Sequence, residues 1–133
     1  MAKRILVVDD HAPTRTLIRV ILEAEKPAYS VVEVATGVDC LKAHSTQGPF
    51  DLVLLDVNLP DMDGFEVCRS LRSVDDKLPI VFVTSKGDLK DHTAGRAAGG
   101  DSYIVKPVAR AALRSLVSLF TSVDRSKAPG SSA

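Results

Sequence analysis

Five short runs of apolar residues, rich in Val, Ile and Leu, are spaced along the chain. They are residues 4–8, 30–35, 51–55, 79–84 and 102–105. Most of these runs lack the alternation of apolar and polar residues that marks a half-exposed strand. Uninterrupted apolar strands are typical of a parallel sheet whose two faces are both covered by helices. The pattern therefore predicts five parallel strands, most of them buried.

The segments between these runs carry apolar residues at helical spacing. The stripes are Leu17, Ile18, Ile21 and Leu22; Phe65, Cys68 and Leu71; Leu113, Leu116, Val117 and Phe120; and, more weakly, Val38 and Leu41. Residues three and four positions apart lie on one face of a helix, so each stripe predicts a helix packed on the sheet. Residues 88–98 form the weakest predicted helix, because most of their apolar residues are alanines and Gly95 lies among them.

Local signals at two helix starts agree with this interpretation. Pro13 suits a first helical position. Asp63, with Glu66 three residues later, fits a capping box. Strand and helix thus alternate five times, which predicts an α/β protein with an open, doubly wound parallel sheet. In such sheets, ligands bind at the carboxyl ends of the strands.

The composition narrows the possible functions. The chain has 133 residues, enough for one domain, which we expect over residues 1–123, with 124–133 as a flexible tail or the start of a linker. Its 17 basic residues balance 17 acidic ones, so this domain is not expected to bind nucleic acid or a membrane surface. No apolar run approaches the roughly 18 residues of a membrane helix. Cys40 and Cys68 match neither a metal spacing nor a disulfide framework, which favours a cytoplasmic location.

Polar side chains follow four of the five predicted strands. Asp9 and Asp10 follow the first strand and Asp56 follows the third, while Thr84 and Lys106 mark the ends of the fourth and fifth. Three carboxylates at one sheet edge repel one another unless a cation lies between them. Mg²⁺ takes oxygen ligands, commonly one or two carboxylates with phosphate oxygens, and an Asp carboxylate is a competent nucleophile toward phosphorus. The residues therefore predict a magnesium-dependent phosphoryl site with one modified Asp.

Taken singly, each of these residues has an ordinary explanation. An Asp is common in turns, a Thr is common in strands, and most lysines are solvated surface groups. The combination at one edge of the sheet is what favours a site. The remaining polar candidates are interpreted as structural: Asp61 as an acid of a surface loop, and His11, His44 and His92 as solvated or locally bonded groups.

Five stretches, in order and at matching intervals, resemble the receiver domains of two-component response regulators. They are the strand and acid pair at 5–10, the strand and acid at 51–56, the Asn-Leu-Pro-Asp-Met-Asp-Gly run at 58–64, the strand at 79–84 and the Asp-Ser-Tyr-Ile-Val-Lys-Pro run at 101–107. The resemblance covers about residues 3–123. It implies a flavodoxin-like (βα)5 fold, with the five parallel strands in the order 2-1-3-4-5.

The resemblance also implies a metal site and a phosphoacceptor. Asp56 is the expected phosphoacceptor. Mg²⁺ is the expected cofactor, bound by Asp9, Asp10 and Asp56 and by the backbone carbonyl of Asn58.

The remaining implied roles concern the response to phosphorylation. Lys106 is expected to pair with the phosphoryl group, and its peptide bond to Pro107 is expected to be cis. Thr84 is expected to donate its hydroxyl to the phosphoryl group. Tyr103 is the expected aromatic switch, which changes rotamer when Thr84 moves.

The implied function is a signalling switch that takes its phosphoryl group from a histidine kinase or a histidine phosphotransfer protein. Such a domain is not an enzyme in the ordinary sense, because it catalyses only its own phosphorylation and dephosphorylation. We expect residues 88–98, 102–105 and about 108–122 to form the face that changes, and to serve as a partner or homodimer surface. The chain departs from the family pattern in having Gly100 for the usual Ala and Val108 for a common Phe. We expect Gly100, with Gly87, Gly95 and Gly99, to loosen the segment before the fifth strand.

Two other functions fit parts of the pattern. A phosphohydrolase of the haloacid-dehalogenase type also uses a strand-end Asp with Mg²⁺, but its general-acid Asp falls where this chain has Asn58, which cannot donate a proton in that role. A phosphorylation-independent interaction module of the same fold usually lacks some acidic-pocket residues, whereas this chain keeps all of them.

Overall fold

The computed structural model describes residues 2–85 and 89–122, except for the side chains of residues 89–92. Its strands are β1 (Arg4–Val8), β2 (Ser30–Val34), β3 (Leu52–Leu55), β4 (Ile80–Thr84) and β5 (Ser102–Val105). Its helices are α1 (Ala12–Glu23), α2 (Gly37–Gln47), α3 (Gly64–Val74), α4 (Leu89–Ala97) and α5 (Arg110–Phe120). The expected tail, Gly87, Asp88 and the His92 side chain lie outside the described residues.

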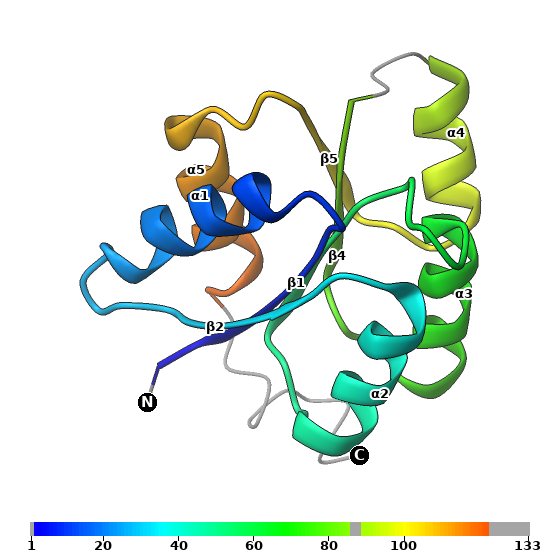
Figure 1. The fold of residues 1–133 in the computed structure, drawn as a ribbon, viewed down its shortest axis with the longest axis horizontal. Helices are drawn as coiled ribbons and strands as arrows, with labels where there is room; N and C mark the ends of the chain where they lie inside the picture. Colours follow the sequence, from blue (N-terminus) through cyan, green and yellow to red (C-terminus); the bar gives the residue numbers. More distant parts are fainter. Residues whose placement is uncertain (1, 86–88, 123–133) are drawn as a thin grey trace.

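The strands form one parallel sheet in the order β2-β1-β3-β4-β5. The predicted α/β class and strand order are therefore confirmed. Figure 1 shows α1 and α5 together on one face of the sheet, and α2, α3 and α4 on the other. No helix in the described part of the chain is long and apolar enough to cross a membrane.

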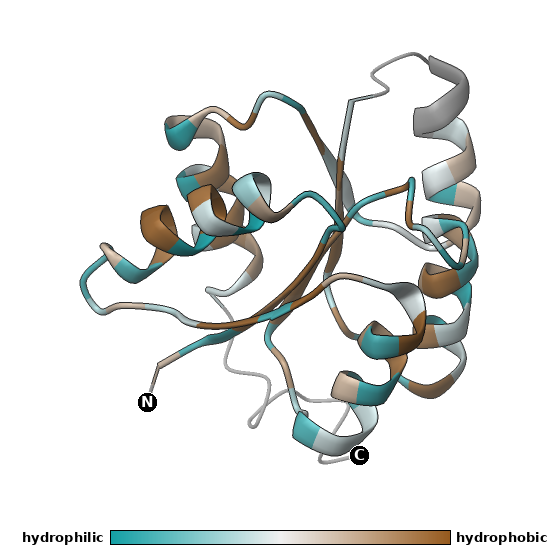
Figure 2. Cartoon of the chain, viewed as in Figure 1, coloured by the Kyte–Doolittle hydropathy of each residue, from teal (hydrophilic) through white to brown (hydrophobic). Residues whose placement is uncertain are grey.

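Alternating side chains of the strands supply two cores, one under each helical layer. In β1, Leu6 and Val8 pack with α2 and α3, while Ile5 and Val7 pack with α1 and α5. Every residue of β3 and β4 is buried, and Figure 2 shows the strands as the most continuous hydrophobic part of the ribbon. A strand buried on both faces needs apolar residues at nearly every position, which explains the uninterrupted runs in the sequence. The one polar residue in these two strands is Thr84, at the end of β4.

The predicted element limits differ slightly from the observed ones. The second, third and fourth strands are each one residue shorter than predicted, and α1 begins at Ala12, one residue before Pro13. Asp63 caps α3 as predicted, accepting a hydrogen bond from the Phe65 amide at 2.7 Å. Two residues assigned to apolar stripes were placed wrongly, because Leu17 is 44% exposed and Val38 is 59% exposed. In α2 the buried face is instead formed by small residues, Gly37, Cys40 and Ala43.

Candidate functional site

Pairing between strands continues past the strand ends and fixes the backbone of the site. The Asp9 amide donates to the Val34 carbonyl at 3.2 Å, and the Asp56 amide donates to the Val8 carbonyl at 2.9 Å. Between the neighbouring strands β4 and β5, the Lys106 amide donates to the Thr84 carbonyl at 2.8 Å. Three of the predicted site residues are thus held by the same ladder that forms the sheet, which brings them to one edge.

The side chains of Asp9 and Asp56 are held in the same way. One oxygen of each carboxylate accepts a hydrogen bond from the amide two residues later: His11 to Asp9 at 2.9 Å, and Asn58 to Asp56 at 3.2 Å. The other oxygen faces Lys106, whose Nζ lies 2.7 Å from Asp9 Oδ2 and 3.2 Å from Asp56 Oδ2. Lys106 therefore bridges the two buried acids.

The acid cluster has room for a cation. Asp9, Asp10 and Asp56 each offer a carboxylate oxygen, and these atoms lie within 4.8 Å of one another. Asp9 is 2% exposed and Asp56 5% exposed, whereas Asp10 lies at the surface. One lysine cannot neutralise three carboxylates, and hard oxygen donors from a few acids are the ligands that suit Mg²⁺. The residues present therefore fit the expected ion.

The pKa values of Asp56 and Lys106 reflect this surplus of negative charge. Burial and the Asp9 carboxylate raise the pKa of Asp56, against the opposing effects of the Asn58 amide and the Lys106 ammonium. Burial lowers the pKa of Lys106, but its contacts with Asp9 and Asp56 outweigh burial, so this pKa lies above its ordinary value. The lysine stays charged, while Asp56 carries an energetic cost for being ionised.

The loop after β3 is folded tightly against Asp56. Asn58 and Asp63 form an isolated antiparallel bridge, and the Gly64 amide donates to the Val57 carbonyl at 2.8 Å. A Cβ on Gly64 would overlap the Asp56 carbonyl oxygen and lie 2.7 Å from the Val57 Cα. Only glycine therefore allows α3 to start this close to the end of β3. The loop places the backbone of Asn58 next to Asp56.

The predicted switch residues lie on neighbouring strands. Thr84 is fully buried at the end of β4, and Tyr103 of β5 pairs in register with Phe82. The Tyr103 hydroxyl oxygen is buried, although the residue as a whole is only partly buried. The Lys106–Pro107 bond is cis, as predicted. The structure thus gathers the acids and Lys106 at one point. Thr84 ends the neighbouring strand β4, and Tyr103 lies beside Gly95 of α4.

Sequence reasoning missed several contacts around the site. Asp61 is not simply a loop acid, since its carboxylate accepts hydrogen bonds from the amides of Gly37 at 2.8 Å and Val38 at 2.9 Å, which cap α2. These bonds lower the pKa of Asp61. His44 of α2 lies 3.3 Å from Asp75 at the end of α3. Both contacts join residues more than 20 positions apart, so no local sequence pattern announces them.

Comparison with known proteins decides the family. The family model described as the response regulator receiver domain matches residues 5–118. The chain belongs to this family. It is a receiver domain of two-component response regulators, as the sequence motifs indicated.

Individual relatives agree with this assignment. The response regulator MprA of Mycobacterium sp. strain KMS is 43% identical over 109 residues, which are 82% of this chain and 46% of MprA. PhoP of Bacillus subtilis, a regulator of alkaline phosphatase synthesis, is 41% identical over 80% of this chain and 43% of its own length. This chain therefore spans less than half the length of each of these two relatives. Among solved structures, a CheY-like receiver domain from Methanospirillum hungatei superposes with a TM-score of 0.84, at 30% identity, over 92% of this chain and 95% of that one.

Proposed function

We propose that the domain is a phosphoacceptor switch, in which Asp56 receives a phosphoryl group from a phosphohistidine of a histidine kinase or a phosphotransfer protein. The observation that carries the proposal is the arrangement of Asp56 beside Asp9, Asp10 and a bridging Lys106 at the carboxyl edge of the sheet. Response regulators in general receive their signal from histidine kinases, and an Asp nucleophile, further acids that could hold Mg²⁺ and a lysine lie together at this edge.

The transfer forms one bond and breaks one. A carboxylate oxygen of Asp56 attacks the phosphorus, the phosphorus–nitrogen bond of phosphohistidine breaks, and the imidazole leaves with the bonding electrons and takes a proton. Mg²⁺, bound by Asp9, Asp10, Asp56 and the Asn58 carbonyl, would neutralise charge on the phosphoryl oxygens. Lys106 already contacts the Asp56 oxygen that would carry or adjoin the new group, so its ammonium is placed to pair with a phosphoryl oxygen.

We propose that the effect of phosphorylating Asp56 is transmitted through Thr84 and Tyr103. A phosphoryl oxygen would take the Thr84 hydroxyl as donor, and Tyr103 on the adjacent strand would change rotamer. The affected face is formed by α4, β5 and α5, where Val105 is 46% exposed and Leu119 is 65% exposed. We propose this face as the partner or homodimer surface. Catalysis by the domain is limited to its own phosphorylation and dephosphorylation, in the cytoplasm.

The phosphohydrolase alternative has little support. It requires an acid two residues after the nucleophile, and that position holds Asn58, whose side chain cannot act as a general acid. The interaction-module alternative predicts no chemistry at Asp56 at all. Labelling experiments therefore separate the proposal from both alternatives.

The test is incubation with acetyl phosphate and Mg²⁺, followed by intact-mass measurement at acid pH, where acyl phosphates survive. We expect one added phosphoryl group, lost on exposure to base. Asp56→Asn should abolish the addition, while the matched surface variant Asp76→Asn should keep it. Undiminished labelling of Asp56→Asn would overturn the assignment, and no labelling of the wild type would favour the interaction module. Continued release of phosphate from a phosphate ester would favour the hydrolase.

A further inference from the structure

Phe82 lies at the centre of a cluster that links β4, α3, α4 and β5. Its side chain is fully buried. Its ring centroid lies 5.1 Å from that of Phe65, at a 73° interplanar angle, and 5.8 Å from that of Tyr103, at 46°. Edge-on and tilted contacts of this kind stabilise aromatic pairs. Phe82 is therefore the direct neighbour of the residue proposed as the switch.

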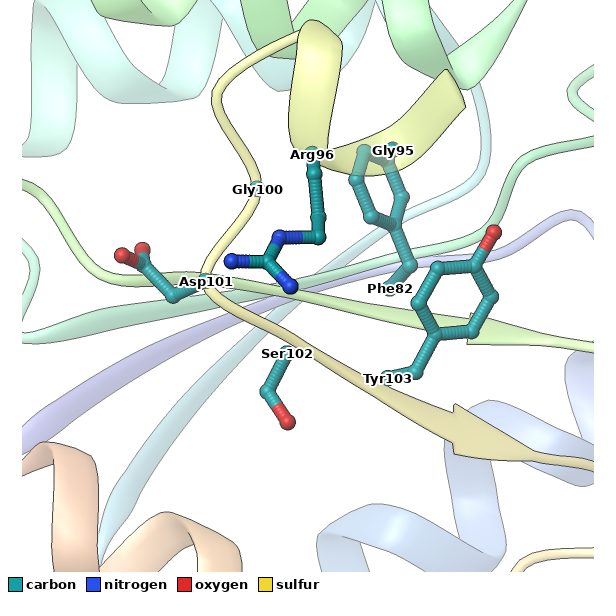
Figure 3. A pocket seen from close by; sticks show the side chains of 7 residues that line it. All are labelled: Phe82, Gly95, Arg96, Gly100, Asp101, Ser102 and Tyr103. Carbon is teal, nitrogen blue, oxygen red and sulfur yellow. The ribbon is translucent and has the colours of Figure 1, made fainter. Parts of the chain in front are cut away.

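Two glycines make room for the Phe82 ring. A Cβ on Gly100 would overlap Phe82 Cε2 and lie 2.9 Å from Cδ2. A Cβ on Gly95 would lie 3.1 Å from Phe82 Cε2 and 3.0 Å from Tyr103 Cε2. Figure 3 shows Phe82 between the end of α4, with Gly95, and the Tyr103 ring. The departure from Ala at position 100 thus has a packing reason: the ring occupies the volume that a methyl group would fill.

Tyr103 and Phe82 both border open space. A cavity of about 530 Å³ is lined by Phe82, Gly95, Arg96, Gly100, Asp101, Ser102 and Tyr103 (Figure 3). Close-packed interiors hold side chains in one place, whereas a ring next to a cavity has room to take another rotamer. The Tyr103 ring therefore packs against the buried ring of Phe82 and has free volume nearby.

We propose that Phe82 is a positioning residue for Tyr103, and that Gly95 and Gly100 are the small residues that let it act as one. The proposal rests on the proposed switch function, which makes the position of the Tyr103 ring matter. Phe82 holds that ring in its place with the hydroxyl buried. A smaller side chain at position 82 would release the ring toward the cavity and weaken its response to a group on Asp56.

The chain offers a clean probe of ring position, because it has no Trp and only two tyrosines. Tyr29, the other tyrosine, lies on the far side of the sheet, where its hydroxyl is 3.5 Å from Thr121 Oγ1. Fluorotyrosine incorporation followed by ¹⁹F NMR would therefore give two resonances, one from Tyr103 and one from Tyr29 as an internal reference.

The first comparison needs no phosphodonor. In Phe82→Leu the Tyr103 resonance should move toward its position in the unfolded chain, while the Tyr29 resonance stays in place. Phe50→Leu is the matched control, because Phe50 is equally buried and its ring lies under the guanidinium of Arg4, at the start of β1. That variant should lose stability and leave the Tyr103 resonance unchanged. An unchanged Tyr103 resonance in Phe82→Leu, or an equal movement in Phe50→Leu, would overturn the proposal.

The second comparison tests the glycine. Gly100→Ala should move the Tyr103 resonance, because the new methyl displaces the Phe82 ring. The double variant Phe82→Leu/Gly100→Ala should return the resonance toward its wild-type position, because the methyl then fills space that the smaller Leu leaves. Additive movements in the double variant would show that positions 82 and 100 act independently and would contradict the proposal.

Addition of beryllofluoride and Mg²⁺ separates this inference from the function on which it rests. The wild-type Tyr103 resonance should shift on addition, and Phe82→Leu should show a smaller shift at saturation. No shift in the wild type would count against the proposed function, even if the first two comparisons succeed. A full shift in both proteins would leave the proposed function standing and reject the role of Phe82.

Discussion

Replacing Asp56 by Asn should stabilise the fold, although it removes the proposed phosphoacceptor. The carboxylate oxygens of Asp9 and Asp10 lie within 4.8 Å of that of Asp56, and Lys106 Nζ lies 3.2 Å away. With an effective dielectric constant of about 20, each repulsion is worth about 3.5 kcal/mol and the attraction about 5 kcal/mol. The net repulsion of about 2 kcal/mol, with burial acting in the same direction, is relieved when position 56 becomes neutral.

The gain should depend on pH with a defined sign. The folded-state pKa of Asp56 is raised above 3.8, so the ionised side chain costs stability at neutral pH. As pH falls through this raised pKa, the wild type gains a proton and the cost disappears. The advantage of Asp56→Asn should therefore be full at pH 7 and vanish as pH falls to the unfolded-state value.

The assay is urea unfolding of both proteins at several pH values, without divalent cations. At pH 7 the variant should be more stable by about 2 kcal/mol, which raises the melting temperature by roughly 5–10 °C in a domain of this size. Saturating Mg²⁺ should narrow the gap, because it binds the folded wild type more tightly. The exposed-site variant Asp76→Asn should match the wild type. Equal or lower stability of Asp56→Asn at pH 7 would refute the reasoning that the three acids repel one another.

Four further predictions follow from the site and its surroundings. Asp10→Asn should abolish or strongly weaken Mg²⁺ binding, and an unchanged titration would mean that the metal lies elsewhere. Lys106→Ala should bind Mg²⁺ more tightly, because it frees the carboxylates of Asp9 and Asp56. The same variant should lose the amide-exchange changes that beryllofluoride induces across α4 and β5, and retained changes would contradict the role of the lysine. Gly64→Ala should destabilise the fold by about 1–3 kcal/mol or more, the usual cost of overpacking. An unchanged urea-unfolding midpoint in this variant would contradict the overlap with the Asp56 carbonyl. Burial raises the pKa of Cys40 to about 12 and that of Cys68 to about 11, so both thiols should resist a disulfide reagent at pH 8 until the protein unfolds; rapid labelling of the folded protein would contradict their burial.

The sequence predicted the sheet well because burial on both faces leaves a direct signature. β3 and β4 have no exposed residue, and all their positions except Thr84 at the end of β4 are apolar, so the runs are uninterrupted up to the strand ends. The carboxyl-edge rule for parallel sheets then placed Asp9, Asp56 and Lys106 together from the strand ends alone. Their convergence in the structure follows from the ladder that the strands form.

Other features depend on tertiary contacts that leave no local pattern. The cap that Asp61 provides for α2 joins the loop after β3 to the start of the helix, and its residues are 23 or 24 positions apart. Leu17 and Val38 fit helical stripes yet lie at the surface, because spacing alone does not give the width of the buried face. From the sequence alone, Gly95 and Gly100 predict a loosely packed segment before β5. Only the structure shows that both glycines make room for the Phe82 ring.

Asp56 is the residue proposed to carry the phosphoryl group. Its most direct test is peptide mapping by mass spectrometry after reaction with acetyl phosphate and Mg²⁺ and an acid quench. The account predicts a single phosphorylated position, Asp56, and no phosphorylated peptide when Mg²⁺ is chelated before the donor is added. A phosphoryl group on any other residue of the wild type, or full modification of Asp56 without Mg²⁺, would contradict it.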